Sequence, residues 1–200
     1  MRKLFKLILL SCAILLLAAC SMNTGEVASI EDVKLDKAEQ GAIASLADQY
    51  FFYEIKIKDR DIRNVYWGVD VYRKGKRISQ HPFSGGILSE EDLQKPVKLF
   101  LARQAEDRPA ATWISQLYTE SGLIGTTSSE ETADYLKNKG YGVRTIPSDT
   151  VLKKGKRKVI GRITSTDQEP YPDVPAETDK EIQALTKRYD TAYFLWIKVE

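Results

Sequence analysis

The sequence predicts an α+β protein, a single β-rich domain with a mainly antiparallel sheet or sandwich and two helices. Three observations predict this class. Apolar and polar residues alternate over several segments of strand length. Helix-capping residues mark only a few short helical segments. Roughly 150 residues remain after an N-terminal leader and a polar stretch, which is the size of one domain that buries ~70% of its unfolded surface.

The N-terminal twenty residues have the order of a secretory signal peptide. Three basic residues precede a mostly apolar run over residues 7–17, and this run is too short for a spanning helix with polar flanks. The segment ends in Leu17-Ala18-Ala19-Cys20, which resembles the lipobox of bacterial lipoproteins. The resemblance implies that residues 1–19 are removed and that the sulfur of Cys20, the mature N-terminus, carries a diacylglyceryl group with acyl chains such as palmitate.

This lipid would define where the protein works. Two acyl chains hold a protein stably at a membrane without a spanning helix. We therefore expect an extracytoplasmic, lipid-anchored protein whose first partner is the membrane. Ser21 follows the cysteine in place of aspartate, and the resemblance then favours the outer membrane if the cell has two. The alternative is a signal peptide in which Cys20 is incidental.

Removing the leader also limits the chemistry of the mature chain. The only other cysteine, Cys12, lies within the leader, so no disulfide, thiol nucleophile or thiolate metal site is expected. Taking Arg2, Lys3 and Lys6 from the 30 basic residues leaves 27 against 28 acidic ones. This balance gives no support for binding to nucleic acid.

Residues 20–48 are expected to hold the lipidated cysteine, a polar tether over 21–37 and a short helix. The motif Ser29-Ile30-Glu31-Asp32 has capping-box spacing, with aspartate in the last position. Asp36 is a second candidate cap, for a helix within 36–48. The β-rich extracytoplasmic domain is then expected over residues 49–200.

Period-two alternation predicts the strands of the first half of this domain. The expected strands cover 50–58, 65–71, 76–79, 97–103, 111–118 and 123–127. The first two are expected to be antiparallel neighbours, because only a short polar connection over 59–64 separates them. Lys74-Gly75 predicts a tight turn between the second and third.

The second half is expected to add two helices and three strands. Ser128 and Ser129 precede an expected helix over 130–139, and Thr178 opens another that runs to about Tyr189. The strands cover 141–146, 158–164 and 191–199, and Lys154-Gly155 forms a turn before the second of them. The last strand is expected inside a sheet. Two small domains that divide near Thr127 are the alternative organisation.

His81 is the only histidine and the first candidate for catalysis. It lies three residues before Ser84, so His81 could act as a general base toward that hydroxyl. The Gly-x-Ser-x-Gly elbow of many hydrolases is absent. A histidine without a catalytic role in a surface loop next to Pro82 is the favoured interpretation.

No metal or cofactor is expected. A single histidine and no mature thiol exclude zinc sites built mainly from histidine and cysteine. The acidic clusters Glu90-Glu91-Asp92 and Glu130-Glu131 lack the ligand spacing of a calcium loop, and Gly85-Gly86 is not a phosphate-binding loop. No pair of carboxylates stands out as a glycosidase pair.

Two basic segments share the core Lys-Gly-Lys-Arg eighty residues apart. These are Arg73-Lys74-Gly75-Lys76-Arg77 and Lys153-Lys154-Gly155-Lys156-Arg157. The simpler interpretation is a pair of hairpin tips, in which glycine adopts a positive φ. The functional interpretation is a pair of cationic tips that contact anionic lipids, acidic envelope polymers or an acidic protein. The candidate binding residues are Lys74, Lys76, Arg77, Lys154, Lys156 and Arg157.

A lipid-anchored envelope lipoprotein that acts as a binding or interaction module is therefore the favoured function. An envelope hydrolase that uses His81 or a carboxylate pair is the alternative from the enzyme class. A structural or assembly factor that pairs its terminal strand with a partner is the third. Aromatic residues at strand positions also suggest a face for glycans or peptides, although core packing explains such residues equally well: Tyr50, Phe52, Tyr66, Tyr72, Tyr118 and Trp196.

Overall fold

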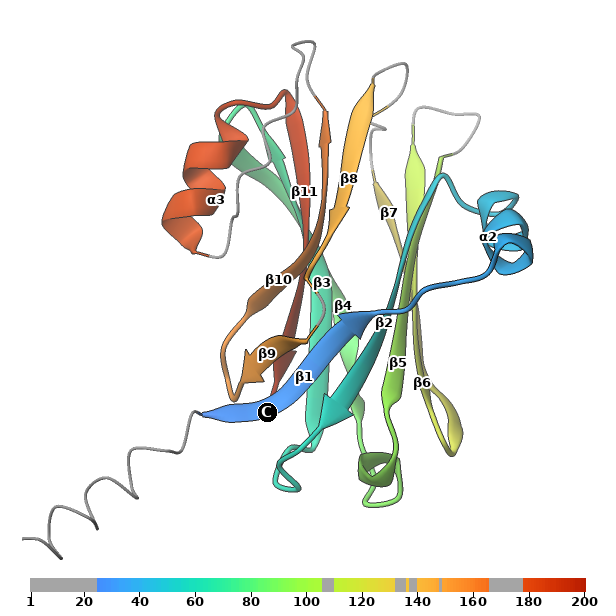
Figure 1. Ribbon diagram of the computed structural model, residues 1–200. Coiled ribbons are helices and arrows are strands. Elements are labelled where there is room, and N and C mark those ends of the chain that lie inside the picture. Colours follow the sequence, from blue (N-terminus) through green and yellow to red (C-terminus); the bar gives the residue numbers. More distant parts are fainter. Residues whose placement is uncertain (1–24, 106–109, 132–135, 137–139, 148, 166–177) are drawn as a thin grey trace, which may run out of the picture.

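The computed structural model describes residues 25–105, 110–131, 136, 140–147, 149–165 and 178–200 (Figure 1). Within these ranges the elements follow one another as β1 (Glu26–Asp32), α2 (Lys37–Ala44), β2 (Gln49–Ile57), β3 (Asn64–Arg73), β4 (Lys76–Ile87), η1 (Asp92–Gln94), β5 (Val97–Ala105), β6 (Ala111–Thr119), β7 (Gly122–Glu131), β8 (Tyr141–Thr145), β9 (Thr150–Lys153), β10 (Lys158–Ser165), α3 (Asp179–Thr186) and β11 (Thr191–Val199).

The strands form two antiparallel sheets that pack face to face. The six-stranded sheet has the order β7-β6-β5-β2-β1-β9, and the five-stranded sheet has the order β4-β3-β11-β10-β8. Helix α3 lies outside the five-stranded sheet and α2 lies on the side of the six-stranded sheet (Figure 1). The predicted α+β class, a β-rich sandwich with two helices, is confirmed.

The predicted alternation places large side chains between the sheets. The inward-facing residues of β2 and β3 are buried: Phe51, Tyr53, Ile55, Val65, Trp67, Val69 and Val71. Their neighbours along each strand point to the outer faces, because successive side chains of a strand alternate. The outer face of the five-stranded sheet is where the candidate site lies.

A buried hydrogen bond of Tyr53 links the two sheets through the core. The hydroxyl of Tyr53 on β2 donates to the carbonyl of Ile160 at 2.5 Å. Ile160 lies at an irregularity in the β10–β11 register, between Val159 and Gly161. A Cβ at Gly161 would lie 2.7 Å from this hydroxyl. Glycine is therefore required there for the tyrosine to reach its acceptor.

The polar tether predicted over 21–37 is wrong for residues 26–32, which form β1. This strand pairs with β2 on one side and with β9 on the other. Ala28 and Ile30 have no exposed surface. Glu26 and Glu31 lie on its other side and pair with lysines of β2 and the residue after it. These acidic residues made a buried strand resemble a solvated segment, and the helix expected to start at Ser29 does not form.

A helix does follow Asp36, as predicted. The Asp36 carboxylate accepts hydrogen bonds from the backbone N–H groups of Ala38 and Glu39, both at 2.8 Å. Glu39 returns a contact to the N–H of Asp36 at 2.8 Å. This capping box stabilises α2, although none of the helix residues is buried.

The prediction that β2 and β3 are paired neighbours is wrong, because they lie in different sheets. Both edges of β2 are occupied, one by β1 and the other by β5. The connection crosses the open end of the sandwich and inserts Ile62, which has no exposed surface. A polar connection of this length permits either a hairpin or a crossing to the second sheet, and the burial of Ile62 favours the crossing.

The two Lys-Gly turns have different roles. Lys74 and Gly75 have φ values of 48° and 82° and join the paired strands β3 and β4. Two consecutive positive φ values are typical of a type I′ hairpin turn. Gly155 also has a positive φ, 70°, but its turn connects β9 in one sheet with β10 in the other. The second turn is therefore not the hairpin tip that the sequence suggests.

The C-terminal elements match the prediction. Thr178 caps α3 through a capping box with Glu181. Strand β11 pairs with β3 on one edge and with β10 on the other. The assembly-factor hypothesis requires a free edge on β11 to which a partner strand could add. Because the backbone groups of β11 are used on both sides, it offers no such edge.

The helix predicted over 130–139 does not begin where expected. Glu130 and Glu131 belong to β7, where they pair with Thr112 and Ala111 of β6. The rest of the predicted helix lies outside the described residues except for Leu136, which is buried. The capping pattern at Ser128 and Ser129 was overridden by strand pairing, since a cap contributes only ~1 kcal/mol.

Candidate functional site

A cavity of about 770 Å³ lies on the outer face of the five-stranded sheet. Its wall includes the start of α3, and its floor comes from β3, β10 and β11. The lining includes charged side chains and an apolar or aromatic surface beneath them. The charged ones are Asp70, Arg77, Lys156 and Arg157, and the larger rings are Tyr72, Phe194 and Trp196.

Asp70 is the central polar residue of this cavity. It points outward from β3 between the inward-facing Val69 and Val71, and it is 5% exposed. Its Oδ2 accepts a hydrogen bond from Nη2 of Arg157 at 2.7 Å and lies 3.7 Å from Nη1 of Arg77. Its Oδ1 accepts from the indole Nε1 of Trp196 at 3.1 Å. The buried carboxylate is thus compensated by two cations and one neutral donor.

Arg157 also stacks on the aromatic floor. Its guanidinium carbon lies 4.0 Å from the ring centroid of Trp196, which is a cation–π geometry. Gly68 on β3 makes room for this ring, because a Cβ there would lie 2.6 Å from the indole and 2.7 Å from the carbonyl oxygen of His81. The outer sheet surface is therefore shaped to hold Trp196 flat beneath Arg157.

The two basic segments do not place their turns together. The N–H of Lys74 donates to the carbonyl of Asp190, just before β11, and the N–H of Gly155 donates to Val199 at the end of β11. The nine residues of β11 separate these turns by about 27 Å. Only the last residue of each segment, Arg77 and Arg157, turns back over the sheet to reach Asp70.

The predicted binding residues therefore divide into two groups. Arg77, Lys156 and Arg157 line the cavity. Lys74, Lys76 and Lys154 are exposed and do not line it. Among the lining side chains that the structure describes, three cations against the single carboxylate of Asp70 leave a formal charge of +2. Both guanidinium groups remain accessible, with side chains 50% exposed for Arg77 and 41% for Arg157.

Helix α3 closes one side of the cavity. Its residues Ile182 and Leu185 pack with Phe194 and Ala192 of β11 in a second apolar cluster, outside the main core. Thr178 and Gln183 add polar groups to the cavity wall. The N-terminal capping box and this apolar contact fix the position of the wall relative to Asp70.

His81 lies elsewhere, on β4 at the edge of the core between the two sheets, so the surface loop expected around it is wrong. It is 7% exposed. Its Nε2 lies 3.1 Å from the hydroxyl of Ser79, and its Nδ1 lies 2.7 Å from the hydroxyl of Ser129 on β7. The side chain of Ser84 lies outside the described part of the structure. His81 does not line the charged cavity.

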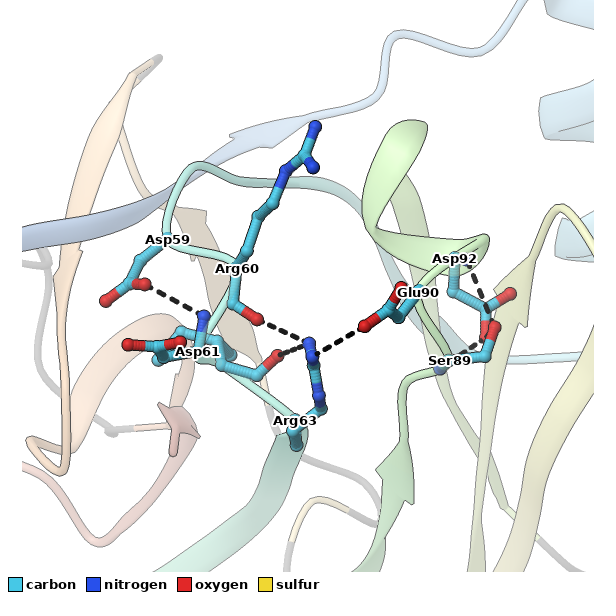
Figure 2. A network of polar contacts seen from close by, with 8 residues as sticks. Asp59, Arg60, Asp61, Arg63, Ser89, Glu90 and Asp92 are labelled. Carbon is cyan, nitrogen blue, oxygen red and sulfur yellow. Dashed lines mark hydrogen bonds and ion pairs between the residues drawn. The ribbon is translucent and has the colours of Figure 1, made fainter.

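The acidic cluster at 90–92 is divided among separate partners at one end of the sandwich, as Figure 2 shows. Glu90 lies 3.4 Å from the guanidinium of Arg63. Asp92 turns away from it and accepts from the hydroxyl and the N–H of Ser89 at 2.7 and 2.9 Å. Within the residues that the structure describes, no three histidine, cysteine, aspartate or glutamate side chains form a group that could hold a metal ion.

The aromatic residues singled out in the sequence do not form one face. Tyr50, Phe52 and Tyr118 belong to strands of the six-stranded sheet, whereas Tyr66, Tyr72 and Trp196 belong to the five-stranded sheet. Two of them pack against other rings instead. Phe52 packs edge-on against Phe100 with centroids 6.1 Å apart, and Tyr72 packs against Phe194 at 5.5 Å.

Sequence reasoning missed Asp70 and Gly68. An aspartate between two valines in a strand that is otherwise apolar on both sides was the available signal for Asp70. Nothing in the sequence alone showed that Arg77 and Arg157 converge on it, because that contact depends on the strand order β3-β11-β10.

Together these features define an antiparallel β-sandwich domain with a cationic, aromatic-floored cavity on one outer face. The profile of the YgaN domain matches residues 29–199, so the chain belongs to the YgaN domain family. Neither the curated proteins nor the solved structures contain a match to this chain. None of the helices in the described residues is long and apolar enough to cross a membrane.

Proposed function

We propose that this protein is a lipid-anchored envelope lipoprotein whose β-sandwich binds an acidic polymer in the cavity around Asp70. The observation that carries the binding role is the convergence of Arg77 and Arg157 on one carboxylate from segments eighty residues apart. The anchoring role depends on the resemblance of Leu17-Ala18-Ala19-Cys20 to a lipobox.

The charges of the cavity favour an acidic ligand. A structural role alone requires one cation to compensate Asp70, whereas the cavity supplies Arg77, Lys156 and Arg157. Guanidinium groups bind carboxylates and phosphates with paired hydrogen bonds. An anion that approaches from solvent therefore meets accessible N–H groups on both arginines.

The floor of the cavity favours a ligand that also has apolar surface. Tyr72, Phe194 and Trp196 lie beneath the charged groups, and rings of this kind contribute large contact area at low conformational cost. A repeating polymer with acidic groups along an apolar or sugar-like backbone matches both features. Its apolar parts would contact the half-buried ring of Tyr72, since Phe194 and Trp196 are only 2% and 7% exposed, while its acidic groups pair with the arginines.

The binding role can be tested on the indole signals of the full-length, lipidated protein in detergent micelles. The chain has three tryptophans, and the Trp196→Phe variant assigns the Trp196 N–H signal in nitrogen-15 spectra. We expect this signal to shift on titration with a glutamate hexamer or with a poly(glycerol phosphate) oligomer. The two probes distinguish carboxylate from phosphate recognition, and binding should weaken as salt is raised.

Matched charge variants give the control. Arg77→Gln and Lys154→Gln each remove one positive charge from a basic segment, but only Arg77 lines the cavity. We expect Arg77→Gln to weaken the titration about tenfold, since charge-assisted bonds contribute ~1.5–3 kcal/mol. Lys154→Gln should leave it within about twofold, because a distant exposed charge contributes little. Equal effects of both variants would contradict a specific cavity.

The anchoring role has a separate test. Cells that grow on a radiolabelled fatty acid should incorporate the label into the wild-type chain and not into Cys20→Ser, since serine lacks the sulfur that carries the diacylglyceryl group. Incorporation that is unchanged in Cys20→Ser would refute lipidation at this residue.

A further inference from the structure

The start of β1 leaves little chain between the lipid and the folded domain. The described structure begins at Gly25, and Glu26 is already paired with Lys153 of β9. Cys20 lies five residues before Gly25, so even a fully extended segment spans no more than about 18 Å. A tether of seventeen residues, as the sequence suggested, would have left the orientation of the domain open.

This limit determines which surface is near the membrane once Cys20 is lipidated, a step that rests on the proposed function. The surface around Gly25 cannot move farther from the lipid than the short segment allows. The rest of the sandwich extends away from it, because β1 and β2 run from this end of the molecule toward α2 and back (Figure 1).

The surface around Gly25 is rich in lysine. A depression of about 590 Å³ is lined there by Gly25, Glu26, Val27, Lys58, Asp59, Lys153, Lys154 and Lys156. We call this the N-terminal lysine surface. Glu26 forms an ion pair with Lys58, so the surface keeps an excess of positive charge, with Lys153, Lys154 and Lys156 against Asp59. All three of these lysines are exposed.

We propose that the N-terminal lysine surface lies against the anionic head groups of the membrane that holds Cys20. A lipid chain holds the protein at the bilayer but permits rotation about the tether. Basic residues within a Debye length of an anionic surface, ~8–10 Å, select one orientation. The short tether keeps this surface within reach of the head groups, and its lysines supply the attraction.

The orientation has a consequence for the cavity. Lys156 lines both the N-terminal lysine surface and the cavity around Asp70. One end of the cavity, at Lys156, therefore adjoins the membrane-facing surface, and the rest extends along the sheet toward Gly75 and the start of α3. An acidic polymer that binds there would do so close to the head groups.

Amine reactivity in vesicles tests the proposal directly. The lipidated full-length protein is reconstituted into vesicles of phosphatidylcholine alone, or of phosphatidylcholine with phosphatidylglycerol, and treated with a water-soluble amine reagent. Mass spectrometry then gives the labelling rate of each lysine. We expect Lys153 and Lys154 to react about fivefold more slowly in the anionic vesicles. Lys37, beyond the other end of β1, should react equally in both.

Salt and charge reversal provide the controls. The difference should vanish at about 1 M salt, where the Debye length is only ~3 Å. Reversing both charges, Lys153→Glu with Lys154→Glu, should make Lys58 equally reactive in the two vesicles, whereas Lys37→Glu should leave the slowing of Lys153 and Lys154 intact.

The outcomes distinguish a wrong orientation from an absent lipid anchor. The lipid on Cys20 is verified by mass on the same sample before labelling. A lipidated protein with equal lysine reactivity in both vesicles would overturn the proposed orientation and leave the anchor intact. Absence of the lipid would overturn both.

Discussion

The indole of Trp196 and the guanidinium of Arg157 lie in stacked contact, with 4.0 Å between the ring centroid and the guanidinium carbon. Both groups also donate to the same carboxylate, that of Asp70, at 3.1 and 2.7 Å. Asp70 therefore fixes the cation on the ring before any ligand arrives. A guanidinium that is already ordered loses little conformational entropy when it binds an anion.

Asp70 should oppose ligand binding while it stabilises the fold. We expect Asp70→Asn to lower the free energy of unfolding by about 1–2 kcal/mol, since the arginines that lose their partner are half-exposed. The same variant should bind the glutamate hexamer severalfold more tightly, because it removes the one carboxylate among the described residues that line the cavity. Chemical denaturation measures the first effect and the Trp196 titration the second.

Asp70→Asn should thus lower stability and tighten binding, two effects of opposite sign. Arg77→Gln is the natural comparison, since it should weaken binding with a smaller effect on stability. If Asp70→Asn weakened binding as much as Arg77→Gln, the carboxylate would be a ligand-contacting group and not a competitor for the arginines.

Gly68 should tolerate no side chain, because its place is occupied by Trp196. A Cβ there would lie 2.6 Å from the indole and 2.7 Å from the backbone oxygen of His81. We expect Gly68→Ala to cost about 1–3 kcal/mol of stability, as overpacking does, and to shift the Trp196 N–H signal. Gly41→Ala in α2 is the matched control, since a Cβ there would meet no atom within 4 Å apart from its chain neighbours and the backbone of its own helix. It should not lower stability, because alanine favours helix.

Strands with one apolar face were predictable from this sequence, and their arrangement was not. Alternation located β2, β3, β5 and β6 closely, because each buries one face and the period of two survives in the sequence. It failed for β1, because Glu26 and Glu31 on the outer side concealed the buried Ala28 and Ile30.

The sheet to which each strand belongs was the other feature that could not be predicted from the sequence. Whether β2 continues into a hairpin or crosses to the second sheet depends on which edges β1 and β5 occupy, and these pairings join residues far apart in sequence. The candidate site has the same origin. Arg77 and Arg157 were identified as candidates from their shared motif, but Asp70 and Trp196 meet them only through the order β3-β11-β10.

The hydroxyl of Tyr53 should contribute to stability through its bond across the core. It is fully buried and donates to the carbonyl of Ile160, and burial is the main reason that the pKa of Tyr53 lies well above its usual range. We expect Tyr53→Phe to lower the free energy of unfolding by about 1–2 kcal/mol, because the carbonyl loses its donor in a dry environment. Tyr118→Phe is the control. Its hydroxyl contacts Gln116 at the surface, so its loss should change stability by less than about 0.5 kcal/mol.

Asp92 should make the stability of the fold sensitive to acid. It is 2% exposed, and burial by itself would raise the pKa of its carboxyl. Hydrogen bonds from Ser121, Ser89 and Thr119 outweigh this effect and hold the pKa well below the ordinary value of 3.8. Because the pKa is lower in the folded chain than in the unfolded chain, Asp92 stabilises the fold fully above about pH 3.8, and this contribution is lost as the pH falls through the folded-state pKa.

Asp92→Asn should therefore reduce stability at neutral pH by about 1–3 kcal/mol and flatten its decline between about pH 4 and about pH 2. Glu90→Gln is the matched control in the same turn (Figure 2). Glu90 pairs with Arg63 at 3.4 Å, but its side chain is 89% exposed. Because an exposed ion pair contributes little, removing its charge should change stability by less than about 0.5 kcal/mol at any pH. Urea denaturation at a series of pH values measures both. A wild-type and an Asp92→Asn chain with parallel stability curves below pH 4 would show that Asp92 is not the acid-sensitive group, since the linkage requires the two curves to converge there.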